Sequence, residues 1–340
     1  MIPWSKNGGL LSLLGCLLSC LPAQADNGSR HEFKQPCMGT LFRIVIYSAN
    51  PEEKISAAAK EAFALGIRLD KVFSDYQAGS EVSRFNHAAP GRPMPASPEL
   101  LGLLAICKDL HDETDGKFDP ACGALSRLWR ISRRSGKLPS PRALAAAREA
   151  SGWDRLSIDN GKSIITRLHP GTRLDFGAIG KGYAADRMLQ SLRAAGFASA
   201  SVTAGGDIAA GDAPPGRKGW RIAIRPRGEK NSPAFVIEIS NAACSTSGDV
   251  EQAVQIGDTL YSHIIDLETG LGQTSQRAAA VIAPSCTRSD ALATALCIAG
   301  KKGLKMFRAM PGTEAVLFAP GIDGQAPVQT GGFAVFIGKK

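Results

Sequence analysis

The feature that most constrains the fold is the order of the strand-like and helix-like segments, which come in clusters and do not alternate strictly. Between about residues 200 and 248, short apolar or β-branched segments follow one another, separated by glycine- and proline-rich turns, which predicts antiparallel strands. Helical patterns come earlier, over 55–72, 97–116 and 140–152. This clustering is typical of an α+β fold. The 340 residues, 44% of them hydrophobic, suffice for one large domain or two lobes.

Two more helices and several more strands complete the expected pattern. One helix is expected over 180–197, led by glycine, and another from about residue 289, so that Asp290 would lie in its first turn. Further strands are expected at 40–48, 172–176, 261–267, 277–283 and 332–338.

The N-terminus has the pattern of an export signal. One lysine is followed by an apolar stretch over about 10–21 and then by Ala-Gln-Ala ending at Ala25, which predicts a signal peptide over 1–25. The apolar stretch is too short to span a membrane. Cys16 and Cys20 each stand in a segment that resembles a lipoprotein box, so lipid anchoring is the alternative to soluble export. We expect an exported, periplasmic protein, either soluble or held at the inner membrane by a lipid.

Charge and cysteine content exclude some classes of function. The net charge is +9, but no basic run is flanked by aromatic residues, so we expect no nucleic-acid partner. A basic surface suits anionic ligands. The six cysteines beyond the leader are widely spaced without a C-x-x-C pair, which makes a cysteine zinc site improbable. A disulfide cannot be assigned from sequence.

Three segments carry candidate chemistry. "LDFGAIGKGYAAD" (174–186) runs from a strand through a glycine-rich turn into a helix, where backbone N–H groups and Lys181 could hold phosphate. "YSHIIDLETG" (261–270) places His263 in an expected strand, as a candidate general base. Asp290 and Thr294 are one helical turn apart and could offer two oxygens to Mg²⁺. Each segment also has a purely structural interpretation: an ordinary turn, a buried histidine and a helix start.

Eight segments together resemble the ApbE family of FAD:protein FMN transferases, over roughly residues 36–320. They occur in the family's order: "MGT" (38–40), "SDYQAGSEVSRFN" (74–86), "GKFDPACGAL" (116–125), "LDFGAIGKGYAAD", "TAGGDIAAGD" (203–212), "STSGD" (245–249), "YSHIIDLETG" and "SDALATAL" (289–296).

The resemblance implies a two-lobed fold over 33–340, with antiparallel sheets, packed helices and a flavin cleft between the lobes. It implies Mg²⁺-dependent transfer of FMN from FAD to a Thr or Ser hydroxyl of an acceptor flavoprotein, for which we expect a membrane respiratory subunit, with release of AMP. The implied roles are a catalytic base for His263, metal binding for Ala178, Asp290 and Thr294, and contacts to FAD for Met38, Tyr76, Phe118, Asp119, Asp175, Lys181 and the backbone of Ile264.

Two departures from the family pattern leave these residues in place: Leu267 where proline is usual, and Gly180 where alanine is common. Two rival functions stay open at this point. Water in place of the acceptor hydroxyl would give an FAD pyrophosphatase, and loss of chemistry would give a non-catalytic exported flavin-binding protein.

Overall fold

The computed structural model describes residues 28–226, 234–248, 253–318 and 327–338. The predicted leader, with Cys16 and Cys20, and Asp249 of the "STSGD" segment lie outside these residues. In the described part of the chain, no helix combines the length and the apolar character that crossing a membrane requires. Export and lipidation therefore stay predictions.

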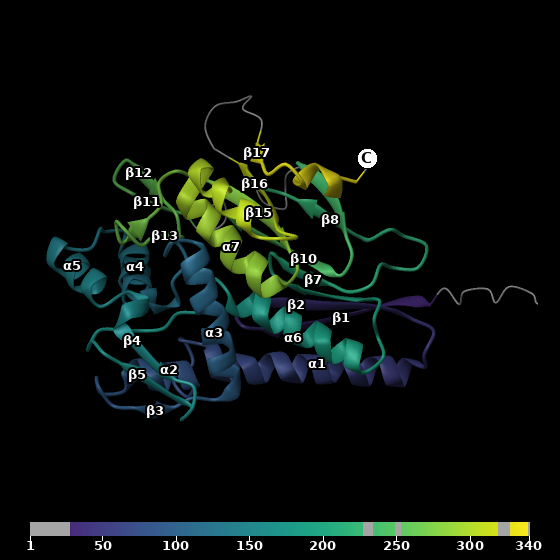
Figure 1. The fold of residues 1–340 in the computed structure, drawn as a ribbon, viewed down its shortest axis with the longest axis horizontal. Helices are drawn as coiled ribbons and strands as arrows, with labels where there is room; N and C mark the ends of the chain where they lie inside the picture. The colour runs from purple at the N-terminus through teal and green to yellow at the C-terminus, as the bar shows by residue number, and fades with distance from the viewer. Residues whose placement is uncertain (1–27, 227–233, 249–252, 319–326, 339–340) are drawn as a thin grey trace, which may run out of the picture.

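An antiparallel sheet of eight strands forms the centre of the molecule (Figure 1). Every neighbouring pair in it is antiparallel, as the clustered strands predict. Its order is β1 (Ser29–Cys37), β2 (Thr40–Ser48), β6 (Ala200–Ala204), β7 (Asp207–Ala210), β10 (Ala242–Gly248), β15 (Ala278–Ala283), β16 (Glu314–Phe318) and β17 (Val328–Gln329).

Both faces of this sheet are covered in its middle. In β15, Ala279 and Val281 face the main core beneath the helices, while Ala280 and Ile282 face a second, smaller core. Successive strand residues point to opposite faces, so an entirely apolar strand requires cover on both sides. The second core is closed by the hairpin of β8 (Trp220–Ile224) and β9 (Phe235–Ile239).

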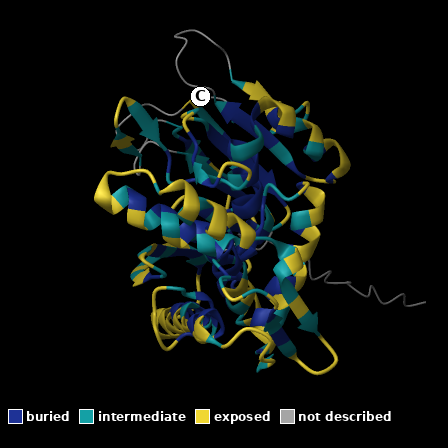
Figure 2. Cartoon of the chain, turned by 90° about the vertical axis from the view of Figure 1, so that its left-hand side faces the viewer, coloured by how far each residue is buried: buried dark blue, intermediate teal, exposed yellow. Residues whose placement is uncertain are grey.

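Long helices pack on the first face of the sheet, and all of them except α7, which has no exposed residue, leave their outer sides exposed (Figure 2). Helix α6 packs between α1 and α7, and both α6 and α7 contact the strands. In α1, an apolar stripe that includes Ile55, Ala62 and Leu69 is buried, as its three-and-four spacing predicts. The bounds are α1 (Glu52–Phe73), α3 (Pro98–Glu113), α6 (Gly180–Ala194) and α7 (Cys286–Ala299).

A smaller lobe lies to the left of α3 and of the C-terminal end of α1 in Figure 1. With the main sheet and its helices, it confirms the predicted α+β class with antiparallel sheets and packed helices. The smaller lobe contains α2 (Glu81–His87), α4 (Gly123–Ser135), α5 (Pro141–Glu149) and a sheet of β3 (Met94–Pro95), β5 (Ile164–Arg167) and β4 (Leu156–Asp159). Two small hairpins lie beside it, β11 (Val254–Ile256) with β12 (Thr259–Tyr261) and β13 (Ile265–Asp266) with β14 (Leu271–Gly272). The described part of the chain also has 3-10 helices at Pro120–Cys122, Trp153–Arg155, Gly300–Ala309 and Phe333–Phe336.

Two expected strands are wrong. Residues 172–176 are irregular because their backbone groups bond to two helices and to no neighbouring strand: Leu174 N–H donates to Asn86 Oδ1 of α2 at 2.7 Å, and Asp175 N–H donates to the carbonyl of Pro120, in a 3-10 helix, at 2.8 Å. Most of 332–338 forms a 3-10 helix in which Phe333 is buried and Val335 is 85% exposed, so the apolar run does not alternate against a sheet.

The last long helix also begins earlier than expected. Helix α7 begins at Cys286, and the Ser285 side chain caps it by accepting the Arg288 N–H. Asp290 therefore lies in the second turn, where interaction with the helix dipole no longer explains a carboxylate. The six cysteines in the described residues are free thiols, and Cys107 and Cys297 are buried on helices as small apolar side chains.

Candidate active site

A cavity of about 1400 Å³ opens beside the central sheet, larger than the roughly 300–1,000 Å³ typical of small-ligand pockets. Its wall comes from the β1–β2 hairpin, the loop after α1, the start of α6, strands β6, β7, β8 and β10, and one side of α7. Six of the predicted site residues line it: Met38, Tyr76, Lys181, His263, Asp290 and Thr294. Five do not: Phe118, Asp119, Asp175, Ala178 and Ile264.

Met38 reaches the cavity through the tight turn between β1 and β2. Cys37 and Thr40 pair across the hairpin, which leaves a loop of Met38 and Gly39, both with positive φ (49° and 72°). Two-residue loops with two positive φ angles match the twist of antiparallel strands. Glycine adopts this conformation freely, whereas methionine rarely does, so the hairpin holds Met38 in a costly conformation at the cavity wall.

The crossing of α6 and α7 sets the charged part of the cavity. A Cβ atom on Gly182 would lie 2.3 Å from the Cys286 carbonyl oxygen, so only glycine allows the two helices to approach this closely. One turn further along α6, the Asp186 carboxylate accepts the N–H groups of Cys286 (2.8 Å) and Thr287 (2.7 Å). This contact satisfies free donors at the start of α7 and holds the helix against α6.

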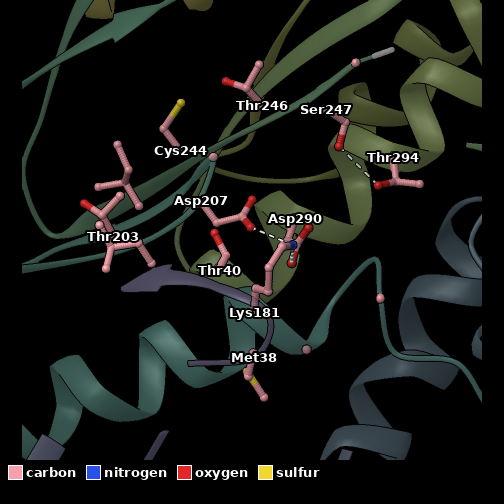
Figure 3. A pocket seen from close by; sticks show the side chains of 18 of the residues that line it. Met38, Thr40, Lys181, Thr203, Asp207, Cys244, Thr246, Ser247, Asp290 and Thr294 are labelled. Carbon is pink, nitrogen blue, oxygen red and sulfur yellow. Dashed lines mark hydrogen bonds and ion pairs between the residues drawn. The ribbon is translucent and has the colours of Figure 1, made fainter. Parts of the chain in front are cut away.

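At this crossing, one lysine meets two buried carboxylates (Figure 3). Lys181 Nζ lies 2.9 Å from Asp207 Oδ2 and 3.3 Å from Asp290 Oδ2. Asp290 Oδ2 also accepts the Gly182 N–H at 3.1 Å. Asp207 and Asp290 are each 3% exposed. Buried charges this close stabilise one another only as a paired set, so the three side chains form one electrostatic unit.

The protonation of this cluster follows from burial and charge. Burial, and then the neighbouring Asp207, raise the pKa of Asp290 to about 7. Burial alone would lower the pKa of Lys181, but Asp207 and Asp290 together hold it above its usual range. Lys181 therefore stays a cation at neutral pH, and the cluster can exchange a proton for another cation at Asp290.

The predicted metal ligands fit a hard, oxygen-preferring ion. Thr294 follows Asp290 by one helical turn, and its Oγ1 lies 3.2 Å from Ser247 Oγ on β10. Ala178 lies in the turn directly before α6. No group of three or more His, Cys, Asp or Glu side chains that could hold a metal occurs among the described residues. One carboxylate, one hydroxyl and one carbonyl are a sparse set, which suits Mg²⁺ because it keeps water and phosphate ligands.

His263 lines the cavity from a bend between β12 and β13, and the expectation that it lies within a strand is wrong. The bend is fixed by its neighbours: Ile264 N–H donates to Ser262 Oγ at 2.9 Å, and Trp129 Nε1 donates to the Ser262 carbonyl at 2.9 Å. Burial, then the charges of Arg133 and Lys181, lower the pKa of His263 to about 4. The imidazole is therefore neutral at pH 7.

Comparison with known proteins shows the family of the chain. The sequence model of the ApbE family matches residues 38–317. The chain belongs to the ApbE family. It is 31% identical to a Treponema pallidum (strain Nichols) protein named FAD:protein FMN transferase, over 91% of each chain. It is 28% identical to the apo structure of the Pseudomonas stutzeri flavinyl transferase ApbE, covering 92% of this chain and 98% of that one, with a TM-score of 0.80. It is 27% identical to the structure of the Thermotoga maritima ApbE protein, covering 92% of this chain and 100% of that one, with a TM-score of 0.81.

Three ApbE-like positions are buried and do not line the cavity. Phe118 is part of the main core. Asp119 caps a 3-10 helix, accepting the N–H groups of Ala121 (2.7 Å) and Trp153 (2.8 Å). Ile264 is 6% exposed, and its N–H is engaged by Ser262. In this structure these residues are held in the core or by local hydrogen bonds, and their direct contact with FAD stays a prediction.

Sequence reasoning missed functional residues that act through tertiary contacts. Asp207 stands within the "TAGGDIAAGD" segment and was given no role of its own, yet it is the nearer of the two carboxylates at Lys181. A carboxylate directly after a Gly-Gly turn and at the start of a buried strand is the signal that could have identified it. Gly182 and Asp186 carry no such signal, because their roles depend on where α7 crosses α6.

Proposed function

We propose that this ApbE family member is an FAD:protein FMN transferase, which moves FMN from FAD to a Thr or Ser hydroxyl of an acceptor flavoprotein and releases AMP. One observation carries the proposal: Lys181, Asp207 and Asp290 form a buried charged cluster in the wall of a cavity of about 1400 Å³, in a chain whose relatives bear that name. A cavity of this size can hold a dinucleotide and leave room for a segment of an acceptor.

The reaction needs positioning and charge more than covalent help from the enzyme. The acceptor oxygen forms a bond to the phosphorus of the FMN half, and the bond from that phosphorus to the bridging oxygen breaks. AMP leaves with that oxygen and its negative charge. The hydroxyl proton passes to His263, which is neutral and lines the same cavity.

The charged cluster supplies the electrostatic part. Asp290, Thr294 and the Ala178 carbonyl would hold Mg²⁺, which when bound supplies positive charge against the pyrophosphate and the leaving AMP. Lys181 adds a fixed positive charge, and Asp207, the nearer carboxylate, would keep this lysine protonated and in place if Asp290 bound the metal.

His263 in the ligand-free cavity is a weaker base than an ideal one, because its pKa of about 4 lies below neutral pH. Burial is the largest cause of this low pKa, and a bound pyrophosphate would offset only the added effect of the Arg133 and Lys181 charges. Substrate binding would therefore raise the basicity of His263 when it is needed.

The acceptor and the compartment are inferred from the predicted leader. The predicted leader over 1–25 supports export to the periplasm, soluble or anchored to the inner membrane. A membrane respiratory flavoprotein subunit with a Thr or Ser target is the acceptor that fits an enzyme in that place.

Product analysis tests the proposal against its rivals. The protein is incubated with FAD and Mg²⁺, with and without a candidate acceptor domain, and AMP and free FMN are quantified by chromatography. A transferase releases AMP in step with acceptor labelling and little free FMN. Rapid release of AMP and FMN without acceptor would identify a pyrophosphatase. FAD that stays intact with both Mg²⁺ and acceptor present would identify a binding protein.

A further inference from the structure

Tyr76 presents an almost free aromatic ring to the cavity. The residue is 77% exposed and lines the cavity wall in the loop after α1. The guanidinium carbon of Arg130, from α4 of the smaller lobe, lies 4.4 Å from the ring centroid. At that distance the guanidinium stacks on one face of the ring, in a cation–π contact. The ring therefore has one supported face and one open face.

Arg130 is itself held by two carboxylates from distant parts of the chain. Its NH1 group pairs with Asp75, and its NH2 group donates to Asp175 Oδ2 at 2.6 Å. Asp175 Oδ1 accepts the Gly177 N–H at 2.8 Å, in the turn that leads into α6. Asp75, Arg130 and Asp175 are at least half-buried, with side chains 17%, 26% and 9% exposed. We call these three residues the arginine clamp.

We propose that Arg130 is a positioning residue, which fixes the Tyr76 ring as a stacking platform for the isoalloxazine ring of FAD. The inference rests on the proposed function and adds a residue to the same site. A tyrosine this exposed would otherwise sample several rotamers and lose that freedom on binding. Fixing the ring before binding removes this entropic cost.

The geometry of the clamp requires arginine. A guanidinium is planar and offers several N–H donors in fixed directions, so it can pair with two carboxylates and still lie flat against a ring. A lysine ammonium keeps the charge, but it is not planar and cannot both pair with two carboxylates and lie flat against the ring. The clamp also joins three segments, the loop after α1, α4 and the turn before α6, so the platform is fixed relative to the Lys181 cluster.

Separate ligands for the two halves of FAD test the inference. Variants Arg130→Met and Arg130→Lys are compared with Arg134→Met, a change of an exposed arginine on the same helix. Binding of FMN, with quenching of its fluorescence, probes the flavin end, and binding of AMP probes the rest of the site. We expect FMN affinity to fall about tenfold in Arg130→Met, with less quenching, and AMP affinity to stay within about twofold. Arg130→Lys should lose most of the same affinity.

A double-mutant cycle separates positioning from general stability. If Arg130 acts through the ring, Arg130→Met adds less than about twofold to the loss of FMN affinity already caused by Tyr76→Ala. Steady-state kinetics should show the KM for FAD raised about tenfold with kcat changed less than about threefold, because the ring lies away from the reacting phosphorus.

Several results would overturn the inference: FMN affinity and quenching equal to those of Arg134→Met, an equal loss of AMP affinity, or full additivity with Tyr76→Ala. The outcome is separable from that of the proposed function. A protein that binds FMN through the clamp but never labels an acceptor would refute the function alone, and one that transfers FMN normally as Arg130→Met would refute the clamp alone. A wild-type protein that binds no FMN would refute both.

Discussion

The two ends of the cavity are built in different ways. At the Lys181 end, charged groups are buried between two helices that touch through Gly182, with no space for even a methyl group. At the Tyr76 end, an exposed ring stands on a surface loop and takes its position from the arginine clamp. The first end has the rigidity that phosphoryl transfer requires, and the second holds an exposed ring in place through side-chain contacts and provides affinity. Substitutions should therefore affect chemistry at one end and binding at the other.

The largest effect is expected at the charged end. Asp290→Ala removes the carboxylate that we assign to Mg²⁺ and leaves Lys181 with one partner, so the rate of Mg²⁺-dependent transfer should fall by about 10³-fold or more. Single-turnover measurement of AMP release checks this. A variant that transfers FMN at the normal rate would show that the metal assignment is wrong.

The next effect concerns the base. His263→Gln keeps a polar side chain of similar size but cannot accept the proton, so kcat should fall by about 10²-fold while the affinity for FAD changes little. Pre-steady-state kinetics with saturating FAD checks the split. Should FAD affinity collapse and kcat persist, His263 would be a binding residue and not a base.

The helix crossing provides a matched pair of glycine variants within the first turn of α6. In Gly182→Ala the new Cβ would meet the Cys286 carbonyl, whereas in Gly180→Ala its nearest neighbour is the Phe176 Cβ at 3.6 Å, an ordinary contact. Gly182→Ala should lower the free energy of unfolding by about 2–3 kcal/mol and Gly180→Ala by less than about 1 kcal/mol. Urea unfolding measures both, and equal values would mean that the crossing tolerates a methyl group.

How far the sequence predicts this site depends on the range of the interactions. Lys181 and the Asp290–Thr294 pair could be found because each stands in a local pattern, a glycine-led helix start or an oxygen pair one turn apart. Arg130 could not, because its partners Asp75 and Asp175 are 55 and 45 residues away in the chain.

The fold shows the same limit. Helices α1, α3, α5, α6 and α7 follow from local patterns and were predicted, whereas α2, α4 and the strand β1 were not. Residues 172–176 look like a strand, but their backbone bonds go to Asn86 and Pro120, which no local pattern indicates. His263 was identified by residue type, while its depressed pKa follows from burial and from Arg133 and Lys181, far away in sequence.

A smaller effect concerns pH and stability. Folding lowers the pKa of His263 from an ordinary 6.5 to about 4. Between these two pH values, the unfolded chain therefore binds more protons than the folded chain. The stabilising effect of keeping His263 neutral is present above pH 6.5 and is lost as the pH falls from about 6.5 towards 4. His263→Gln should flatten this part of the curve when urea unfolding is compared at pH 7.5 and pH 5. An unchanged slope would place the imidazole in water.

The smallest effect is expected at the flavin end. Tyr76→Phe keeps the ring and its contact with Arg130, so the KM for FAD should change less than about threefold. A large rise in KM would mean that the phenol oxygen, and not the ring face, holds the ligand.

The central claim is that the charged cluster of Lys181, Asp207 and Asp290 promotes transfer of FMN from FAD to a protein hydroxyl. Mass spectrometry of an acceptor domain co-expressed with this protein tests it most directly. The account predicts an FMN adduct on a Thr or Ser with the wild-type chain, and none with Asp290→Ala. An acceptor that stays unmodified beside the wild-type chain, or one that carries the same adduct beside Asp290→Ala, would contradict it.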